Sequence, residues 1–333
     1  MCMHVLCDEI DRAEWSRLVA ESATGTWFQT PEAYDFFASQ PEVMEPFGLG
    51  VRSAQGLRGV CVGYVTKEHS AFKQFFTRRA IIIGGPCLAD DATNAEVEGL
   101  MTAIRTTLQH KAIYIETRNF NDYSRWREAF EQAGFTYQPH LNFHVDCTDE
   151  EAMRNKLSDN RKRQIKKALQ NGSHVVEAQK EEEIIAWYAI LKSLYRSKVK
   201  TPLFPLSFFL TFYRKKLGKF LLVKTNERVI GGMMCPILDG KCIYEWFVCG
   251  DDVAYKDASP SVMATYGAME YAHAHTIPIF DIMGAGKPDV PYGVRDFKAE
   301  FGGKLVEHGR FLKVQKPVLY GIGVMGVKML KKI

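Results

Sequence analysis

The order of apolar and polar segments repeats along the chain, because each half contains the same series of predicted elements. The first half contains a strand meander, a helix, a buried strand, a second helix and a last strand, at 47–88, 94–111, 112–118, 123–135 and 137–147. The second half repeats this order at 219–251, 259–275, 277–283, 293–303 and 304–314. Repetition of a whole series of elements predicts a duplicated fold.

Local signals agree with this interpretation. Asp239-Gly240 lies between apolar runs and predicts a hairpin, since the favoured two-residue turn needs positive φ at both positions. Val262, Tyr266 and Met269 recur at helical spacing. The segment 157–172 predicts a helix that is capped by Ser158 or Asp159 and ends at Asn171-Gly172.

A strand meander followed by a β-α-β-α-β series is the pattern of an acyltransferase unit of the GNAT type. We therefore expect an α/β (α+β) protein of two tandem GNAT-like domains, each a mixed, mostly antiparallel sheet flanked by helices. The expected boundaries are 1–150 for the first domain and 151–316 for the second, where an acidic polar run follows the first unit's last strand. An amphipathic helix is expected at 317–333.

Composition narrows the class of protein. The chain has 333 residues, of which 46% are hydrophobic, enough to bury the cores of two domains. A formal charge of +4 is too small by itself to indicate nucleic-acid binding. Eight scattered cysteines without a C-x-x-C pair, and an N-terminus without an apolar signal core, predict a cytoplasmic protein.

The predicted tail has two distinct sides. Val318, Ile322, Met325, Met329 and Ile333 form an apolar stripe, and Lys328, Lys331 and Lys332 cluster on another side. The segment is too short and too charged to span a bilayer, but it suits the interface of an anionic leaflet. Docking on the protein's own second domain is the competing interpretation.

Lys298 is the first candidate for chemistry, in the string GVRDFKAEFGG between Phe297 and Phe301. At the edge of an apolar channel its ammonium would stabilise the oxyanion that forms on a carbonyl under attack. A partly desolvated lysine with a depressed pKa could instead act as a base. The structural alternative is a surface lysine whose stem covers the aromatic rings.

Asp281 ends the apolar strand 277–283, and Gly284 and Gly286 follow, where glycine would allow substrate to approach the backbone closely. The Asp281 carboxylate either accepts a hydrogen from the acceptor amine or caps the glycine turn. Further substrate-binding candidates are expected to line the channel or form basic clusters: Tyr255, Lys256, Tyr292, Arg295, Arg161 and Arg196. Arg161 shares the apolar face of its helix with Ile165 and Ala168, from which its guanidinium could bind phosphate.

Several other chemistries lack their usual motifs. The loops at 87–97 and 250–262, where a GNAT enzyme that uses acyl-CoA carries glycines for the pyrophosphate, are acidic here. The histidine pairs His140 and His144, and His273 and His275, lack a supporting carboxylate or cysteine set, so we expect no metal and no cofactor. Without an evident nucleophile and base pair, we expect the acceptor amine to attack directly.

Three strings carry a family resemblance: IYEWFVCGDDVAYKDASPSVMATYGAMEYA, FDIMGAG and GVRDFKAEFGG. With the duplicated order of elements, they resemble the Fem-type aminoacyltransferases, the peptidoglycan-bridge family of tandem GNAT-like domains. The resemblance implies transfer of an amino acid from aminoacyl-tRNA to an amine on a lipid-linked or nucleotide-linked cell-wall precursor. It also implies that Lys298 lies in the active-site channel.

The chain departs from the family pattern in two places. It lacks a helical coiled-coil arm in the second half, and QTPEAYDFF has Phe36 and Phe37 where some members have a basic residue. The acceptor therefore stays open. We expect a cytoplasmic N-acyltransferase, peripheral on the inner face of the plasma membrane through 317–333. The alternatives are an acyl-CoA or acyl-carrier donor with an aminolipid or amino-sugar acceptor, and a non-catalytic member that binds a precursor.

Overall fold

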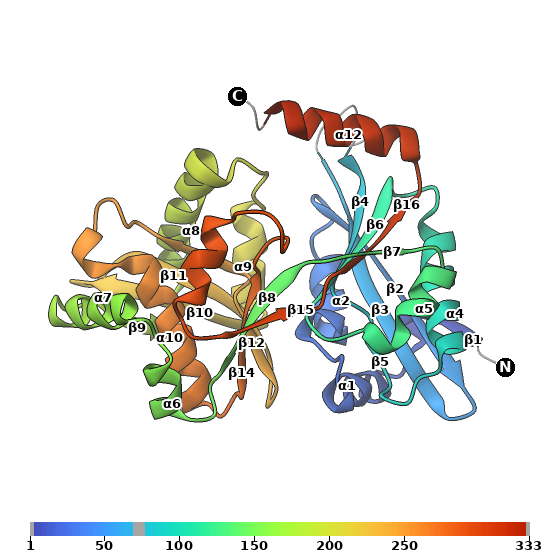
Figure 1. Ribbon diagram of the computed structural model, residues 1–333, viewed down its shortest axis with the longest axis horizontal. Helices are drawn as coiled ribbons and strands as arrows, with labels where there is room; N and C mark the ends of the chain where they lie inside the picture. Colours follow the sequence, from blue (N-terminus) through green and yellow to red (C-terminus); the bar gives the residue numbers. More distant parts are fainter. Residues whose placement is uncertain (1–2, 69–76, 331–333) are drawn as a thin grey trace. The chain divides into compact units, whose positions relative to one another are not determined.

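Two compact units make up the computed structural model, which describes residues 3–68 and 77–330. One unit contains the chain up to His140 together with the segment from Glu307 onward, and the other contains Leu141–Val306. Within the described residues, each unit has one mixed sheet of eight strands with helices against it (Figure 1). The expected fold class, two tandem units with mixed sheets, is confirmed.

The first unit contains the following elements: β1 (Met3–Leu6), η1 (Cys7–Glu9), α1 (Arg12–Glu21), η2 (Trp27–Gln29), α2 (Pro31–Ala38), β2 (Met44–Ser53), β3 (Gly56–Thr66), β4 (Arg79–Gly84), β5 (Cys87–Leu88), α4 (Asn94–Leu108), β6 (Tyr114–Asn119), η3 (Ser124–Trp126), α5 (Arg127–Gln132), β7 (Thr136–Gln138), β16 (Arg310–Val314) and α12 (Pro317–Leu330).

The second unit contains the following elements: β8 (Leu141–Asp146), α6 (Glu150–Asn155), α7 (Asp159–Gln170), β9 (His174–Glu177), α8 (Glu181–Leu194), the π-helical turn η4 (Tyr195–Val199), α9 (Leu206–Arg214), β10 (Gly218–Thr225), β11 (Arg228–Leu238), β12 (Cys242–Tyr244), β13 (Phe247–Gly250), η5 (Lys256–Ala258), α10 (Pro260–Ala274), β14 (Ile279–Gly284), α11 (Gly293–Ala299) and β15 (Lys304–Glu307).

The two sheets have matching strand orders and exchange one strand each. The first sheet runs β1-β2-β3-β4-β6-β16-β7, with β5 paired to β3. The second runs β9-β10-β11-β12-β14-β8-β15, with β13 paired to β11. In each sheet, the strand next to the end comes from the other half of the sequence: β16 lies between β6 and β7, and β8 lies between β14 and β15.

This exchange makes the structural units differ from the expected boundaries of 1–150, 151–316 and 317–333. Residues 141–150 belong to the second unit, because β8 pairs with β14 through Asp146↔Ile279. The segment from Glu307, including α12, belongs to the first unit, because β16 pairs with β6 through Leu312↔Glu116. Lys331, Lys332 and Ile333 of the predicted tail lie outside the described residues.

Each unit has its own hydrophobic core. In the first, α4 and α5 pack on one face of the sheet, and the ring of Phe130 stacks on Phe311 of β16 with the ring centroids 3.9 Å apart. In the second, α10 contacts β10, β11 and β14, with Met263 and Phe280 in the core. Burial of each such side chain contributes about 1.5–3 kcal/mol. The exchanged strand is therefore held by packing as well as by backbone hydrogen bonds.

Candidate functional site

Four ionisable side chains meet in the second unit. The Nζ atom of Lys298 on α11 lies 3.0 Å from Oε1 of Glu245, in the segment between β12 and β13. On the neighbouring strands, Nε2 of His144 on β8 lies 3.3 Å from Oδ2 of Asp281 on β14. Lys298, Glu245 and Asp281 are buried, whereas 21% of the His144 side chain is exposed. This set is referred to below as the lysine cluster.

A β-bulge directs Glu245 into the cluster. Ile237 pairs with Ile243, but Met234 pairs with Phe247, so the strand that contains Glu245 has one more residue than β11 over this interval. The amide of Glu245 donates to the carbonyl of Asp281 at 3.0 Å. An extra residue interrupts the ladder and redirects side chains. The bulge therefore joins the Glu245 segment directly to β14.

β14 is also irregular next to the cluster. Its register with β8 shifts between Asp281 and Gly284, and Met283 has a φ of 53°, in the left-handed region that costs a non-glycine residue about 1–2 kcal/mol. The Oδ1 atom of Asp281 accepts a hydrogen bond from the amide of Met283 at 2.6 Å. Asp281 thus holds the strained turn with one oxygen and faces His144 with the other.

The ammonium of Lys298 joins α11 to the Glu245 side chain and to the turn of β14. Besides the Glu245 carboxylate, it donates to the carbonyl of Ile282 and, at 3.3 Å, to the carbonyl of Gly284. The irregular turn at Met283 presents both carbonyls to it. Burial raises the pKa of Glu245, and the Lys298 charge beside it acts in the opposite direction. The lysine is therefore a buried cation with one carboxylate partner, as the surroundings of a buried charge require.

The rings of Phe297 and Phe301, on either side of Lys298 in the sequence, contact a second cationic side chain. The guanidinium of Arg161 on α7 lies over Phe297 and Phe301, 4.3 and 5.1 Å from their centroids. It also donates to the carbonyl of Phe297 at 3.3 Å, and burial lowers its pKa. Ser158, the N-cap of α7, donates to Glu300 at 3.0 Å. These contacts fix α11 on α7 and so fix the position of Lys298.

Two further predicted residues shape the loop before α11. The side chain of Arg295 donates to the carbonyls of Lys287, Pro288 and Val290. Tyr292, 41% exposed, lies against Gly286, where a Cβ atom would come 2.9 Å from its ring. Gly286 has a φ of 80°, so this position needs glycine for both conformation and space.

Three predicted residues lie elsewhere in the second unit. Arg196 is exposed on η4, and Lys256 is exposed on η5. Tyr255 packs on the core beside Arg228, whose guanidinium lies 5.8 Å from its ring centroid. All three lie outside the lysine cluster.

The N-termini of the two long helices that follow the acidic loops are already capped by the chain's own carboxylates. At α10, Asp252 accepts hydrogen bonds from the amide of Ser261, at 3.0 Å, and from its hydroxyl. At α4, Thr93 and Glu96 form a capping box. An anion at a helix N-terminus needs free amides and a local positive potential. The capping contacts occupy amides at both N-termini, and the carboxylates lower the positive potential there.

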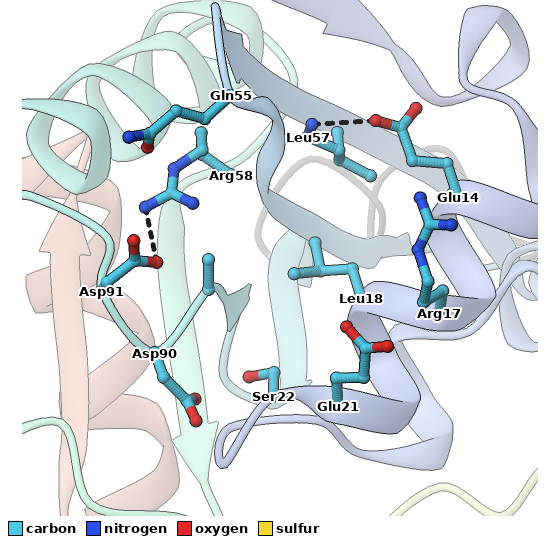
Figure 2. Close-up of a pocket in the computed structure, with 11 residues that line it drawn as sticks. Glu14, Arg17, Leu18, Glu21, Ser22, Gln55, Leu57, Arg58, Asp90 and Asp91 are labelled. Carbon is cyan, nitrogen blue, oxygen red and sulfur yellow. Dashed lines mark hydrogen bonds and ion pairs between the residues drawn. The ribbon is translucent and has the colours of Figure 1, made fainter.

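A pocket of about 340 Å³ lies in the first unit and includes no residue of the lysine cluster (Figure 2). Leu18 and Leu57 lie at its centre, with charged side chains around them, of which Arg58 pairs with Asp91 at 2.7 Å and Glu14 accepts from the amide of Leu57 at 2.9 Å. The lining has an excess of acids, with Glu14, Glu21, Asp90 and Asp91 against Arg17 and Arg58, and it lacks a buried lysine like that of the lysine cluster. Among the described residues, no group of histidines, cysteines and acids is placed to hold a metal ion.

Glu245 is the member of the cluster that sequence reasoning missed, and His144 is named there only in a histidine pair that lacks a metal-binding set. Glu245 interrupts the apolar run IYEWFV, and a lone acid in such a run is a signal of a buried ion pair. His144 was considered as a metal ligand, but its carboxylate partner, Asp281, lies far away in sequence. The alternative that Asp281 caps the glycine turn fits its hydrogen bond to Met283.

Comparisons with known proteins identify the fold. Residues 155–298 match the family model described as an acetyltransferase (GNAT) domain, which ends at Lys298. The chain is similar to FemX, with a TM-score of 0.72 and 14% identity, covering 97% of this chain and 99% of that one. The C-terminal domain of a putative lysylphosphatidylglycerol synthetase from Agrobacterium fabrum has a TM-score of 0.59 and 12% identity, covering 96% and 95%.

A tandem GNAT protein from the clavulanic acid biosynthesis pathway is also similar, with a TM-score of 0.54 and 9% identity over 95% of this chain and 99% of that one. No curated protein matches the chain. The chain therefore has a tandem GNAT-type N-acyltransferase fold, and the resemblance to Fem-type proteins seen in the sequence is confirmed at the level of the fold.

Proposed function

We propose that the protein is an N-acyltransferase that moves an aminoacyl group from aminoacyl-tRNA to the amine of a lipid-linked or nucleotide-linked cell-wall precursor. The observation that carries the proposal is the buried Lys298–Glu245 pair beside the strained turn of β14, inside the segment that matches the GNAT domain. Active sites are places where burial and strain of this kind are maintained.

In this proposal Lys298 stabilises the negative charge that develops on the ester carbonyl. Its contact with the carbonyl of Gly284, at 3.3 Å, is longer than the 3.0 Å contact with Glu245. The substrate oxygen replaces the Gly284 carbonyl, while Glu245 and Ile282 keep the ammonium in place. A preorganised cation in a site of low dielectric favours the transition state without reorganisation.

The acceptor amine must lose a proton as it attacks the ester carbonyl. Asp281 is 1% exposed and uses both oxygens inside the protein, so it acts through His144, which reaches the surface. His144 accepts the amine proton, and Asp281 stabilises the resulting imidazolium. As the new C–N bond forms and the ester C–O bond breaks, His144 gives this proton to the leaving ribose oxygen. A carboxylate that orients a histidine base is a general device of acyl transfer. Gly284, Gly286, Tyr292 and Arg295 form the substrate-binding loop, with Arg161 behind it.

The donor can be tested directly. Because Asp252 and the Thr93–Glu96 capping box occupy the helix N-termini, a pyrophosphate group would meet negative charge there. We expect transfer from charged tRNA to an amine-bearing precursor, and no transfer from acetyl-CoA. Mass spectrometry of the acceptor after incubation with each donor measures the transfer of the acyl group. Uncharged tRNA is the control. Turnover with acetyl-CoA and none with charged tRNA would refute aminoacyl-tRNA as the donor. Tight binding of the precursor without turnover with any donor would refute the acyltransferase activity.

We place the protein in the cytoplasm, peripheral on the inner face of the plasma membrane through α12. Among the described residues no helix is long and apolar enough to cross a bilayer. On α12, Val318, Ile322 and Met325 recur at helical spacing with exposures of 78%, 44% and 56%. Such an exposed apolar stripe fits the headgroup boundary of an anionic leaflet.

Removal of residues 317–333 should therefore release the protein from vesicles that contain phosphatidylglycerol, as measured by co-sedimentation. The substitution of Val318 and Met325 by serine should have the same effect, because it removes apolar contact without changing the charge. Vesicles of phosphatidylcholine serve as the control, since the anionic contribution is then missing. Equal co-sedimentation of the truncated and full-length proteins would exclude α12 as the anchor.

A further inference from the structure

Three arginines share one face of the first unit's sheet, opposite the face that α4 and α5 cover. Tyr114, Glu116 and Arg118 alternate with the buried residues of β6 and so project from this face. In the parallel pairing of β4 and β6, Arg79 lies opposite Tyr114. The pairing Leu312↔Glu116 of β16 and β6, continued by two residues, brings Arg310 opposite Arg118.

Two of these guanidiniums share one carboxylate oxygen. The Nε atom of Arg118 lies 2.8 Å, and Nη1 of Arg310 3.1 Å, from Oε1 of Glu116. Arg310 also contacts Nε2 of His140 at 2.8 Å. Like charges directly opposite each other on neighbouring strands are unfavourable. The single negative charge of Glu116 therefore bridges two guanidiniums and offsets only one of their two positive charges.

Arg79 adds a third positive charge to the same group. The side chain of Arg79 hydrogen-bonds to that of Tyr114, and both Arg79 and Arg118 act on the pKa of the buried Tyr64, which burial raises and the two arginines lower. Both guanidiniums therefore lie near one phenol. Among the described side chains that these contacts bring together, three guanidiniums and one carboxylate leave an excess of two positive charges.

Partial burial makes this positive excess costly, most of all at Arg310. Burial, and then the Arg118 charge, lower the pKa of Arg310, although Glu116 raises it. For Glu116, burial acts to raise the pKa, but Arg310 and Arg118 outweigh it and lower it. The Nε atoms of Arg79 and Arg310 are buried without a hydrogen-bond partner. A buried donor without a partner is costly, and an anion bound between these guanidiniums would supply the missing acceptors.

We propose that Arg79, Arg118 and Arg310 form a binding site for a compact dianionic phosphate group. Guanidiniums present planar pairs of donors that match phosphate oxygens, and two negative charges balance the excess of two positive ones. The side chains remain accessible, with exposures of 38% for Arg118 and 24% for Arg310. The proposal is independent of the acyl-transfer chemistry, because all of these residues lie in the first unit.

The location suggests two sources for the phosphate. Figure 1 shows α12 across the ends of β4, β6 and β16, and Tyr320 of α12 packs edge-on against Tyr114 with the ring centroids 5.3 Å apart. The site thus lies beside the proposed membrane helix. The phosphate belongs either to a lipid headgroup or to a soluble phosphorylated compound, and the chemistry of recognition is the same for both.

The test is isothermal titration calorimetry of the full-length protein at low salt, with inorganic phosphate and pyrophosphate as probes. We expect saturable binding by the wild type and at least about tenfold weaker binding by Arg79→Gln, which removes a charge-assisted donor without breaking an ion pair. Arg127→Gln is the matched control, because Arg127 lies over Tyr137 on another part of the same unit, 3.8 Å from its ring centroid. This variant should bind as the wild type does.

Vesicles with phosphatidic acid, compared with phosphatidylcholine vesicles and titrated with the full-length variant Val318→Ser with Met325→Ser, separate the two sources. Binding that Arg79→Gln weakens assigns a lipid headgroup, and binding of the soluble probes alone assigns a soluble compound. Arg310→Gln is a second test of the site, but it breaks the ion pair with Glu116. If this variant fails to fold, Arg79→Gln still tests whether the arginines bind phosphate. Absence of binding by the wild type, or equal losses in Arg79→Gln and Arg127→Gln, would overturn the site.

Discussion

Replacement of Lys298 by methionine is expected to lower the rate of acyl transfer by at least about 100-fold, the scale of losing one preorganised donor to an oxyanion. The methionine side chain has a similar length but cannot donate to a carbonyl oxygen. The same substitution leaves Glu245 buried without its cation, which costs about 3–5 kcal/mol of folding stability. A loss of activity in this variant alone would therefore have two explanations.

The double variant Lys298→Met with Glu245→Gln separates them. It removes the unpaired buried charge, so its free energy of unfolding should return most of the way to the wild-type value, whereas its acyl transfer should stay low. Urea denaturation measures the first quantity and single-turnover transfer the second. Recovery of activity together with stability would show that Lys298 is purely structural.

A second large effect is expected at Asp281. Alanine at this position removes the acceptor that holds the left-handed turn at Met283, and with it the carbonyls of Ile282 and Gly284 that contact Lys298. We expect a loss of about 2–4 kcal/mol in stability, from the unsatisfied buried amide and the altered turn. Transfer should decrease by at least about 100-fold, because the lysine loses its fixed position.

Asparagine at position 281 is the informative comparison. Its side-chain oxygen can still accept from the amide of Met283, but it no longer offers a negative charge to His144. Stability should therefore stay close to that of the wild type, while transfer falls by about tenfold and the pH dependence of transfer changes. If Asp281→Asn transfers at the wild-type rate with an unchanged pH profile, the His144–Asp281 pair has no part in the reaction.

The order of elements could be predicted from the sequence, but their pairing could not. The apolar periods and turn signals give a meander followed by alternating helices and strands in each half, and Ser158 caps α7 as expected. Strand partners depend on edges that are distant in sequence. In the sequence β8 follows the short strand β7, and β16 follows the short strand β15. Sequence order alone would therefore predict the pairs β7–β8 and β15–β16.

The candidate site was predictable at polar residues beside apolar strings, but not where an irregular backbone decides the direction of a side chain. Lys298 and Asp281 stand out as polar residues beside apolar strings, and the structure places both in one cluster. Glu245 lies at a bulge, so the alternation of sides along a strand does not show which way it points. Arg161 was expected to bind substrate, but its guanidinium is engaged by Phe297 and Phe301.

The exchange of strands also has a consequence for synthesis on the ribosome. The second unit is contiguous in sequence, from Leu141 to Val306, so its sheet can close as soon as that stretch has emerged. The first unit lacks the strand between β6 and β7 until the residues from Gln138 to Arg310 have been translated, which takes roughly ten to thirty seconds at about 5–20 residues per second. The half of the protein that is made first is therefore the half that finishes folding last.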